Sequence, residues 1–260
     1  MRLPPGPVAR RAPRAAAAVL AAVLMLGLAA CEPRSAPEPT DGYTFRTAAD
    51  DTAAVKVYMG REIAPVTASH DTSTGAADRD PRAINEFPDR VVEALDLRPT
   101  DVVADIGAGT GYFTFRLSPR VPRGRVLAVD IVPAMLAAVE QRAAEESIEN
   151  VETILGTEDD PRLPAGSVDV ALIVGSYHEF SHPREMMERI VEALRAGGRV
   201  VLVEYRAEDP TLPVPRLHTM SEAQARREMS AVGLVWRQTK DILPQQHFMV
   251  FEKPARGPVG

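Results

Sequence analysis

Short apolar runs alternate with longer amphipathic stretches beyond residue 100 of the chain. The runs have the length of strands and are nearly continuous in Val, Ile, Leu and Ala, as in strands that are buried on both faces. We predict strands at Val102–Ile106, Val126–Asp130, Val151–Leu155, Val168–Val174 and Val200–Glu204. Helical patterns fill most of the gaps, notably at Pro133–Glu146 and Pro183–Ala196. This alternation predicts a mainly parallel sheet with helices on both faces.

The end of the chain has a different pattern. The apolar segments Leu234–Lys240 and His247–Lys253 are separated only by Asp241–Gln246, which is too short for a crossover helix. Two strands joined so briefly form an antiparallel hairpin. We therefore predict an α/β fold with a doubly wound, mainly parallel seven-stranded sheet that ends in an antiparallel hairpin. This domain is expected to span residues 98–254.

Residues 43–97 are predicted to form a helical N-terminal extension. The predicted helical pieces are Asp50–Ala64 and Pro88–Leu95, and the Ser/Thr/Asp/Gly-rich stretch Thr67–Asp80 between them is predicted to be an exposed loop.

The first 30 residues have the organisation of a signal peptide. Arginines precede the apolar run Ala15–Ala30, which is too short for a comfortable transmembrane span. The junction Leu28-Ala29-Ala30-Cys31 resembles the bacterial lipobox, in which the cysteine is lipidated and becomes the new N-terminus. We expect a signal peptide at 1–30, lipidation of Cys31, a Pro-rich tether over 31–42, and a membrane-anchored exported lipoprotein that faces the periplasm. The alternative is an alanine-rich helix on a cytoplasmic protein.

Composition and charge restrict the partners. The chain is 45% hydrophobic and 25% charged, so its 260 residues can bury a full core in one domain. Four of the 30 basic residues and none of the 36 acidic ones lie in residues 1–30, which leaves a net charge of −10 on the remainder. Such a surface repels phosphate backbones, so nucleic acid is not expected as a substrate.

A glycine-rich loop follows the first predicted strand directly. Its sequence is Asp105-Ile-Gly107-Ala-Gly109-Thr-Gly111, and glycines let a backbone turn sharply and approach a ligand closely. The dinucleotide fingerprint G-x-G-x-x-G would need glycine at position 112 or 114, where tyrosine and threonine stand. The G-K-[ST] of a phosphate loop is absent. The remaining pattern, an acid followed by G-x-G-x-G, resembles motif I of the class I S-adenosylmethionine-dependent methyltransferases.

Three further points along the chain are similar to the same family. The second predicted strand ends at Asp130, where an acid can accept hydrogen bonds from both ribose hydroxyls. After the third strand, Glu158 and Asp159 occupy the place where the family presents a polar or acidic side chain to the adenine amine, and either residue fits. The turn Ala196-Gly197-Gly198-Arg199 before the fifth strand resembles the glycine-containing turn of the family.

The resemblance implies S-adenosylmethionine as the cofactor and methyl transfer to an unidentified small or medium-sized acceptor. It places Asp105 near the amino group of the cofactor's amino-acid tail and the three glycines along the path of that tail. Ile131 and Tyr177 complete the expected cofactor-binding residues. No metal ion is among the expected cofactors, contact with a membrane is expected through the lipid anchor only, and the oligomeric state is left open.

A narrower resemblance connects the chain with exported bacterial proteins that have a methyltransferase domain and an unknown substrate. It rests on the segments Tyr58-Met59-Gly60-Arg61-Glu62-Ile63-Ala64, Tyr177-His178-Glu179-Phe180, Glu204-Tyr205-Arg206 and Leu243-Pro244-Gln-Gln-His247.

The candidate catalytic residues follow the fourth and fifth predicted strands, because ligands of open α/β sheets bind beyond the carboxyl ends of the strands. Methyl transfer is an in-line displacement at carbon, and it needs a base only when the nucleophile carries a proton. We expect His178 or Glu179 to be that base and Tyr205 to orient the acceptor. The alternative is that these residues shape the pocket of a cofactor-binding protein without catalysis.

The segment His178-Glu179-Phe-Ser-His182 also matches the H-E-x-x-H signature of zinc peptidases. That signature requires a helix to bring both histidines onto one face. Here Pro183 suits the first turn of the next helix, so His182 is expected to precede the helix. Folding could bring His218, His247 or Glu204 near as a third ligand. A zinc hydrolase is the less favoured alternative.

Overall fold

The computed structural model describes residues 42–47, 54–65 and 87–255, all of which belong to the compact unit Pro39–Gly260. The predicted signal peptide, Cys31, the tether up to residue 41 and the predicted loop Thr67–Asp80 lie outside the described residues. In the part of the chain that is described, no helix is both long enough and apolar enough to cross a membrane.

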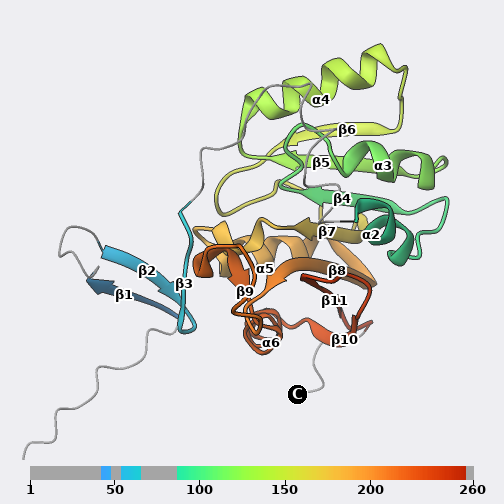
Figure 1. Ribbon diagram of the computed structural model, residues 1–260. Coiled ribbons are helices and arrows are strands. Elements are labelled where there is room, and N and C mark those ends of the chain that lie inside the picture. The colour runs from blue at the N-terminus through green and yellow to red at the C-terminus, as the bar shows by residue number, and fades with distance from the viewer. Residues whose placement is uncertain (1–41, 48–53, 66–86, 256–260) are drawn as a thin grey trace, which may run out of the picture. The chain divides into compact units, whose positions relative to one another are not determined.

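The main sheet has the topology that the sequence predicts. Its strands are β4 (Val102–Ile106), β5 (Arg125–Asp130), β6 (Val151–Leu155), β7 (Val168–Val174), β8 (Leu194–Arg206), β9 (Thr219–Met220), β10 (Val235–Lys240) and β11 (Gln246–Glu252). Seven of them run in the order β10-β11-β8-β7-β4-β5-β6, and the short β9 pairs with β8 off this path (Figure 1). Strands β4 to β8 pair in parallel, whereas β11 is antiparallel to both β8 and β10. The doubly wound, mainly parallel sheet with an antiparallel end is therefore confirmed.

Helices cover both faces of this sheet. They are α2 (Pro88–Ala94), α3 (Thr114–Leu117), α4 (Pro133–Glu145), α5 (Pro183–Ala193) and α6 (Glu222–Ala231). Helices α5 and α6 pack on one face, in the same core as Val102, Ala104 and Ile106 of β4. Helices α2 and α3 pack on the other face with Val103, and α4 lies beside α3 through Val139. Successive residues of β4 thus enter opposite cores, which is why its sequence is apolar at every position except Asp105.

The N-terminal extension differs from the prediction. Its described part is a three-stranded antiparallel sheet made of β1 (Tyr43–Thr47), β2 (Ala54–Tyr58) and β3 (Arg61–Glu62). The helix predicted at Asp50–Ala64 is wrong for the described residues of that range. Met59 and Gly60 both have positive φ, 47° and 89°, which is the geometry of a two-residue hairpin turn. The β-branched Val55 and Val57 favour strand on either side of Lys56. Only α2 of the predicted helical pieces is present there.

Candidate functional site

A cleft opens at the carboxyl ends of β4, β5 and β7, where open α/β sheets bind their ligands. Its empty volume is about 1260 Å³, part of which is open to solvent. The walls come from the glycine-rich loop after β4, the turns after β5 and β6, and the segment after β7. Each of these segments directly follows a parallel strand, so the sheet itself brings them together.

The glycine-rich loop closes one side of the cleft. The backbone N–H groups of Gly107 and Ala108 both donate to the carbonyl of Val129 in β5, at 2.9 and 3.0 Å. At Gly109, which has a φ of +55°, an added Cβ would meet no atom of the described residues within 4 Å, apart from those of its chain neighbours. At Gly111 it would lie 2.5 Å from the ring of Phe115. Gly109 therefore faces open space in the cleft, whereas Gly111 does not line the cleft and permits packing against α3.

Asp105 places a buried carboxylate in the wall of the cleft. Its side chain accepts a hydrogen bond of 2.7 Å from the Thr114 hydroxyl and has no cationic partner among the described residues. Burial raises the pKa of Asp105 to about 6, although the hydrogen bonds from Thr114 act in the opposite direction. A buried carboxylate without a counter-charge is costly for the fold, and a cationic group of a ligand would remove that cost.

Asp130 connects the second strand to the glycine-rich loop. Its two carboxylate oxygens accept hydrogen bonds from the backbone N–H groups of Gly109, at 2.8 Å, and of Val132, at 2.9 Å. A carboxylate has about four acceptor sites, so capacity remains for ligand hydroxyls. Ile131 is the next residue, and its exposed side chain also lines the cleft.

The turn after β6 distinguishes between the two acids that the sequence left open. Glu158 lines the cleft, and its carboxylate accepts a hydrogen bond of 2.8 Å from the Ser181 hydroxyl. Asp159 is not among the lining residues, and its carboxylate accepts a hydrogen bond of 2.7 Å from the Thr157 hydroxyl. The structure therefore places Glu158, not Asp159, where it can contact a ligand.

The segment after β7 begins with the 3₁₀ turn η3 (Tyr177–Glu179), which sends its side chains in different directions. Glu179 lines the cleft, as do Ser176 and Phe180. Tyr177 is fully buried in the core under α5 and α6, and its hydroxyl donates to Glu228 at 2.7 Å. The expectation that Tyr177 contacts the cofactor is therefore not supported, because its ring belongs to the core.

His178 is buried and lies between a carboxylate and a second histidine. Its Nδ1 is 2.7 Å from Oε2 of Glu204, a fully buried residue of β8, and its Nε2 is 3.0 Å from Nδ1 of His218. Burial lowers the pKa of His178, but the charge and hydrogen bond of Glu204 outweigh burial and raise it above the ordinary value. His218 belongs to the 3₁₀ turn η4 (Arg216–His218) that precedes β9. Glu204 thus determines which ring nitrogen of His178 faces His218.

The other candidate catalytic and metal-binding residues, Tyr205, His182 and His247, do not lie beside His178 and His218. Tyr205 is half-buried in β8, pairs with Thr219 and Gln246, and lies outside the cleft lining. His182 is the N-cap of α5, as predicted, so the helical H-E-x-x-H arrangement is absent. The ring of His247 is 2.9 Å from Glu208 instead.

The N-terminal sheet and the residues that follow it form hydrogen bonds to the segment after β7. The guanidinium of Arg61 in β3 binds both carboxylate oxygens of Glu228 in α6, at 2.8 and 2.9 Å, and also donates to the carbonyl of His178 at 3.1 Å. The N–H of Ala64 donates to the same carbonyl. Arg61 has a side-chain exposure of 10% and Glu228 of 0%, so this is a buried ion pair that also contacts Tyr177.

Sequence comparisons identify relatives for the central part of the chain. Residues 103–198 match the family model of a methyltransferase domain. The chain is 30% identical over 143 residues to an uncharacterized methyltransferase of Bacillus subtilis. The matched segment covers 54% of this chain and 56% of that protein. It is 35% identical over 114 residues to the nocamycin O-methyltransferase of Saccharothrix syringae, with 44% and 41% covered. The chain thus spans about half the length of these curated relatives.

The fold also has a close counterpart among solved structures. An S-adenosylmethionine-dependent methyltransferase from Aquifex aeolicus superposes with a TM-score of 0.63 at 20% identity, covering 70% of this chain and 98% of that one. The two proteins share the α/β fold with the antiparallel end that is described above.

Proposed function

We propose that this chain, whose residues 103–198 match the model of a methyltransferase domain, is a class I S-adenosylmethionine-dependent methyltransferase and transfers a methyl group from that cofactor to a small or medium-sized acceptor. The observation that carries the proposal is the carboxylate of Asp105, which is buried in the cleft wall without a cationic partner among the described residues. Asp105 would pair with the ammonium group of the cofactor's amino-acid tail, which carries the missing positive charge.

The remaining acids of the cleft fit the other parts of the cofactor. Asp130 would accept hydrogen bonds from the ribose hydroxyls, and Glu158 would face the adenine amine. Gly107 and Gly109 line the path of the tail, and the open space at Gly109 leaves room for it. When bound, S-adenosylmethionine supplies a methyl carbon attached to a positively charged sulfur, so the protein has mainly to position the acceptor in line with it.

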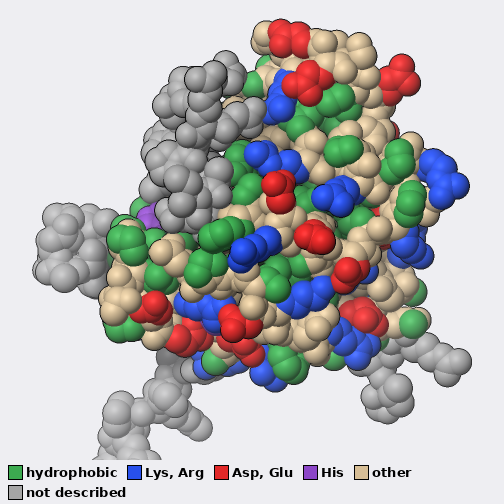
Figure 2. Space-filling view, turned by 45° about the vertical axis from the view of Figure 1, so that its right-hand side comes forward, with side chains coloured by type: hydrophobic (Ala, Val, Ile, Leu, Met, Phe, Trp, Pro, Cys, Tyr) green, Lys and Arg blue, Asp and Glu red, His purple; other side chains and the backbone are tan. Residues whose placement is uncertain are grey.

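We propose that the acceptor binds at the β7 side of the cleft, between Ser176, Glu179 and Phe180. Phe180 offers an apolar surface, and Glu179 and the neighbouring His178 offer polar groups to an acceptor that carries a proton. On the described part of the face seen in Figure 2, Lys and Arg side chains are interspersed with Asp and Glu. That distribution and the net charge favour a small acceptor over a nucleic acid.

Ligand binding by the purified full-length protein tests the choice of cofactor on which this function depends. S-Adenosylhomocysteine at 100 times its dissociation constant should stabilise the native state by about 2.7 kcal/mol and raise the melting temperature, whereas NAD should not. Equal shifts with both ligands, or a shift with NAD alone, would contradict the proposal.

We also propose that the protein is an exported lipoprotein anchored through Cys31. The basic start, the short apolar run and the Leu28-Ala29-Ala30-Cys31 junction support this. Two acyl chains suffice for stable anchoring, so the protein should fractionate with membranes and resist high-salt washing. Cys31→Ala should abolish lipid labelling without changing cofactor affinity. Wild-type protein without an acyl chain on Cys31 by mass spectrometry would refute the anchor.

A further inference from the structure

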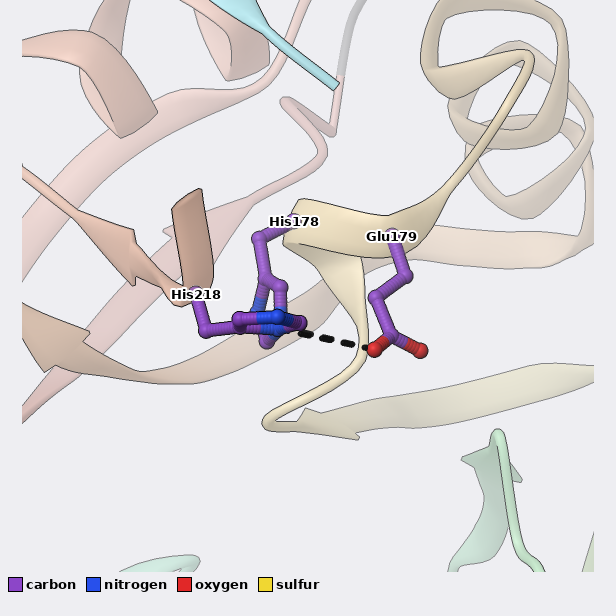
Figure 3. Close-up of side chains that lie close together, drawn as sticks. All are labelled: His178, Glu179 and His218. Atoms are coloured by element: carbon purple, nitrogen blue, oxygen red, sulfur yellow. Dashed lines mark hydrogen bonds and ion pairs between the residues drawn. The ribbon is translucent and has the colours of Figure 1, made fainter. Parts of the chain in front are cut away.

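Two histidines and a glutamate converge beside the cleft from segments that are 40 residues apart (Figure 3). His178 and Glu179 come from η3, and His218 comes from η4. We propose that this histidine cluster (His178, Glu179 and His218) binds one divalent transition-metal ion. Nothing in the sequence spacing predicts this set, because its third member is supplied by the connection between β8 and β9.

The distances within the histidine cluster are those of a coordination site. Nε2 of His178 lies 3.0 Å from Nδ1 of His218 and 3.9 Å from Oε1 of Glu179, and the last two atoms are 3.6 Å apart. A point equidistant from atoms with these separations lies about 2.1 Å from each, and protein nitrogen and oxygen ligands hold Zn²⁺ at about 2.0–2.2 Å. The side chains therefore need little rearrangement to take up an ion.

A buried carboxylate next to His178 also supports a metal site, independently of the distances within the histidine cluster. Glu204 is fully buried, and its Oε2 lies 2.7 Å from Nδ1 of His178, on the side of the ring that faces away from His218. Metal-binding histidines characteristically donate their other ring N–H to a carboxylate, which fixes the tautomer and the direction of the ring. The carboxylates of Glu179 and Glu204 also place negative charge on two sides of His178, where a divalent cation would balance it.

The donor set indicates the kind of ion and leaves room for a ligand. Imidazole nitrogens suit Zn²⁺, Fe²⁺ and Ni²⁺, whereas Mg²⁺ prefers oxygen ligands and its own waters. Three protein ligands leave at least one coordination position open, as in catalytic rather than structural zinc sites. Glu179 is shared between the histidine cluster and the wall of the cleft, so the ion lies next to the proposed acceptor position.

The ion would bind an acceptor hydroxyl and lower its pKa, so that the proton leaves to solvent. The acceptor oxygen then forms a bond to the methyl carbon while the carbon–sulfur bond breaks and its electron pair stays on sulfur. This role rests on the methyl transfer proposed above, whereas binding of the ion does not.

Titration calorimetry with Zn²⁺ alone, on full-length protein first treated with a chelator, tests the site. We expect one Zn²⁺ per chain and no comparable binding of Mg²⁺. His178→Ala and His218→Ala should each weaken Zn²⁺ binding at least tenfold, and Glu204→Gln should weaken it by about 10- to 100-fold. His182→Ala is the matched control, because this residue completes the H-E-x-x-H spacing but lies outside the histidine cluster, and it should leave the affinity unchanged.

Binding of S-adenosylhomocysteine to each variant verifies that its cleft is folded and separates the two proposals. Loss of Zn²⁺ binding in His218→Ala with S-adenosylhomocysteine binding intact supports the metal site. Zn²⁺ binding that is absent in the wild type, unchanged in His178→Ala and His218→Ala, or dependent on His182 instead, overturns it. If Zn²⁺ binds as expected but S-adenosylhomocysteine does not bind to the wild type, the metal site stands and the methyltransferase function fails.

Discussion

Replacement of Gly109 by alanine tests the assignment of the cleft most directly. Apart from its chain neighbours, the added methyl group would meet no atom of the described residues within 4 Å, so it would occupy the space in which we place the cofactor's tail. Gly166 provides a matched control. It has a φ of +60° against +55° for Gly109, its Cβ position is equally open, and it lies outside the cleft lining.

The two substitutions should cost the fold the same free energy. An L-residue in the left-handed region costs about 1–2 kcal/mol, of which about 0.4–1 kcal/mol is offset because alanine restricts the unfolded chain more than glycine does. We therefore expect a net loss of about 1 kcal/mol of unfolding free energy for both Gly109→Ala and Gly166→Ala. Neither substitution removes the backbone N–H, so the hydrogen bond from residue 109 to Asp130 is retained.

Cofactor affinity should separate the two variants. A methyl group forced into an occupied, well-packed space costs about 1–3 kcal/mol. This corresponds to binding of S-adenosylhomocysteine that is about 5- to 150-fold weaker in Gly109→Ala, with no change in Gly166→Ala. Urea unfolding measures the first quantity, and titration calorimetry measures the second. Equal affinities of the two variants for S-adenosylhomocysteine would show that the tail does not pass Gly109.

Three other results are expected. The pKa of Asp105 is raised to about 6, so the contribution of this residue to the stability of the ligand-free protein falls as the pH rises from about 4 through 6. The ionised carboxylate that then forms attracts the ammonium group of the ligand. S-Adenosylhomocysteine should therefore bind more tightly at about pH 7.5 than at about pH 5. Calorimetry of Asp105→Asn should show weaker binding without this component, and an unchanged pH dependence would contradict the assignment. Asp130→Ala should weaken S-adenosylhomocysteine binding by about 1–3 kcal/mol in the same assay, and unchanged affinity would remove Asp130 from the site. Arg61→Met leaves Glu228 buried without its counter-charge, so urea unfolding should show a loss of about 3–5 kcal/mol, and a loss below about 1 kcal/mol would mean that the pair is unimportant.

The strands that surround the cleft could be predicted from sequence because parallel strands are buried on both faces. Val168–Val174, for example, coincides with β7 to the residue. Asp105 and Asp130 could be placed for the same reason, since each stands at the end of such a strand. The extension is harder to predict because Ala54–Tyr58 is short and contains residues that fit either a helix or a strand. The Met59-Gly60 turn, which joins this segment to β3, favours the strand.

Two features of the site could not be predicted from the sequence, namely the directions of the side chains after β7 and the contacts between residues that are far apart in the chain. Tyr177 and Glu179 are two residues apart after the same strand, yet one enters the core and the other the cleft, because the chain turns through a 3₁₀ helix there. His218 could be named only as one of several groups that folding might bring near His178. Its approach depends on the path between β8 and β9, which leaves no local pattern in the sequence.

The ion pair between Arg61 and Glu228 also affects the order in which the protein can fold. Its partners are 167 residues apart, and Arg61 is synthesised long before α6 exists. Contacts of such separation form late, after the loss of chain entropy between them has been compensated by other contacts. The hydrogen bond from Arg61 to the carbonyl of His178 also joins residues that are 117 apart, so we expect it to form later than the contacts between neighbouring strands around the glycine-rich loop. We therefore expect the segment after β7 to be fixed late in folding, and a nascent chain that stops before α6 would lack the carboxylate that pairs with Arg61.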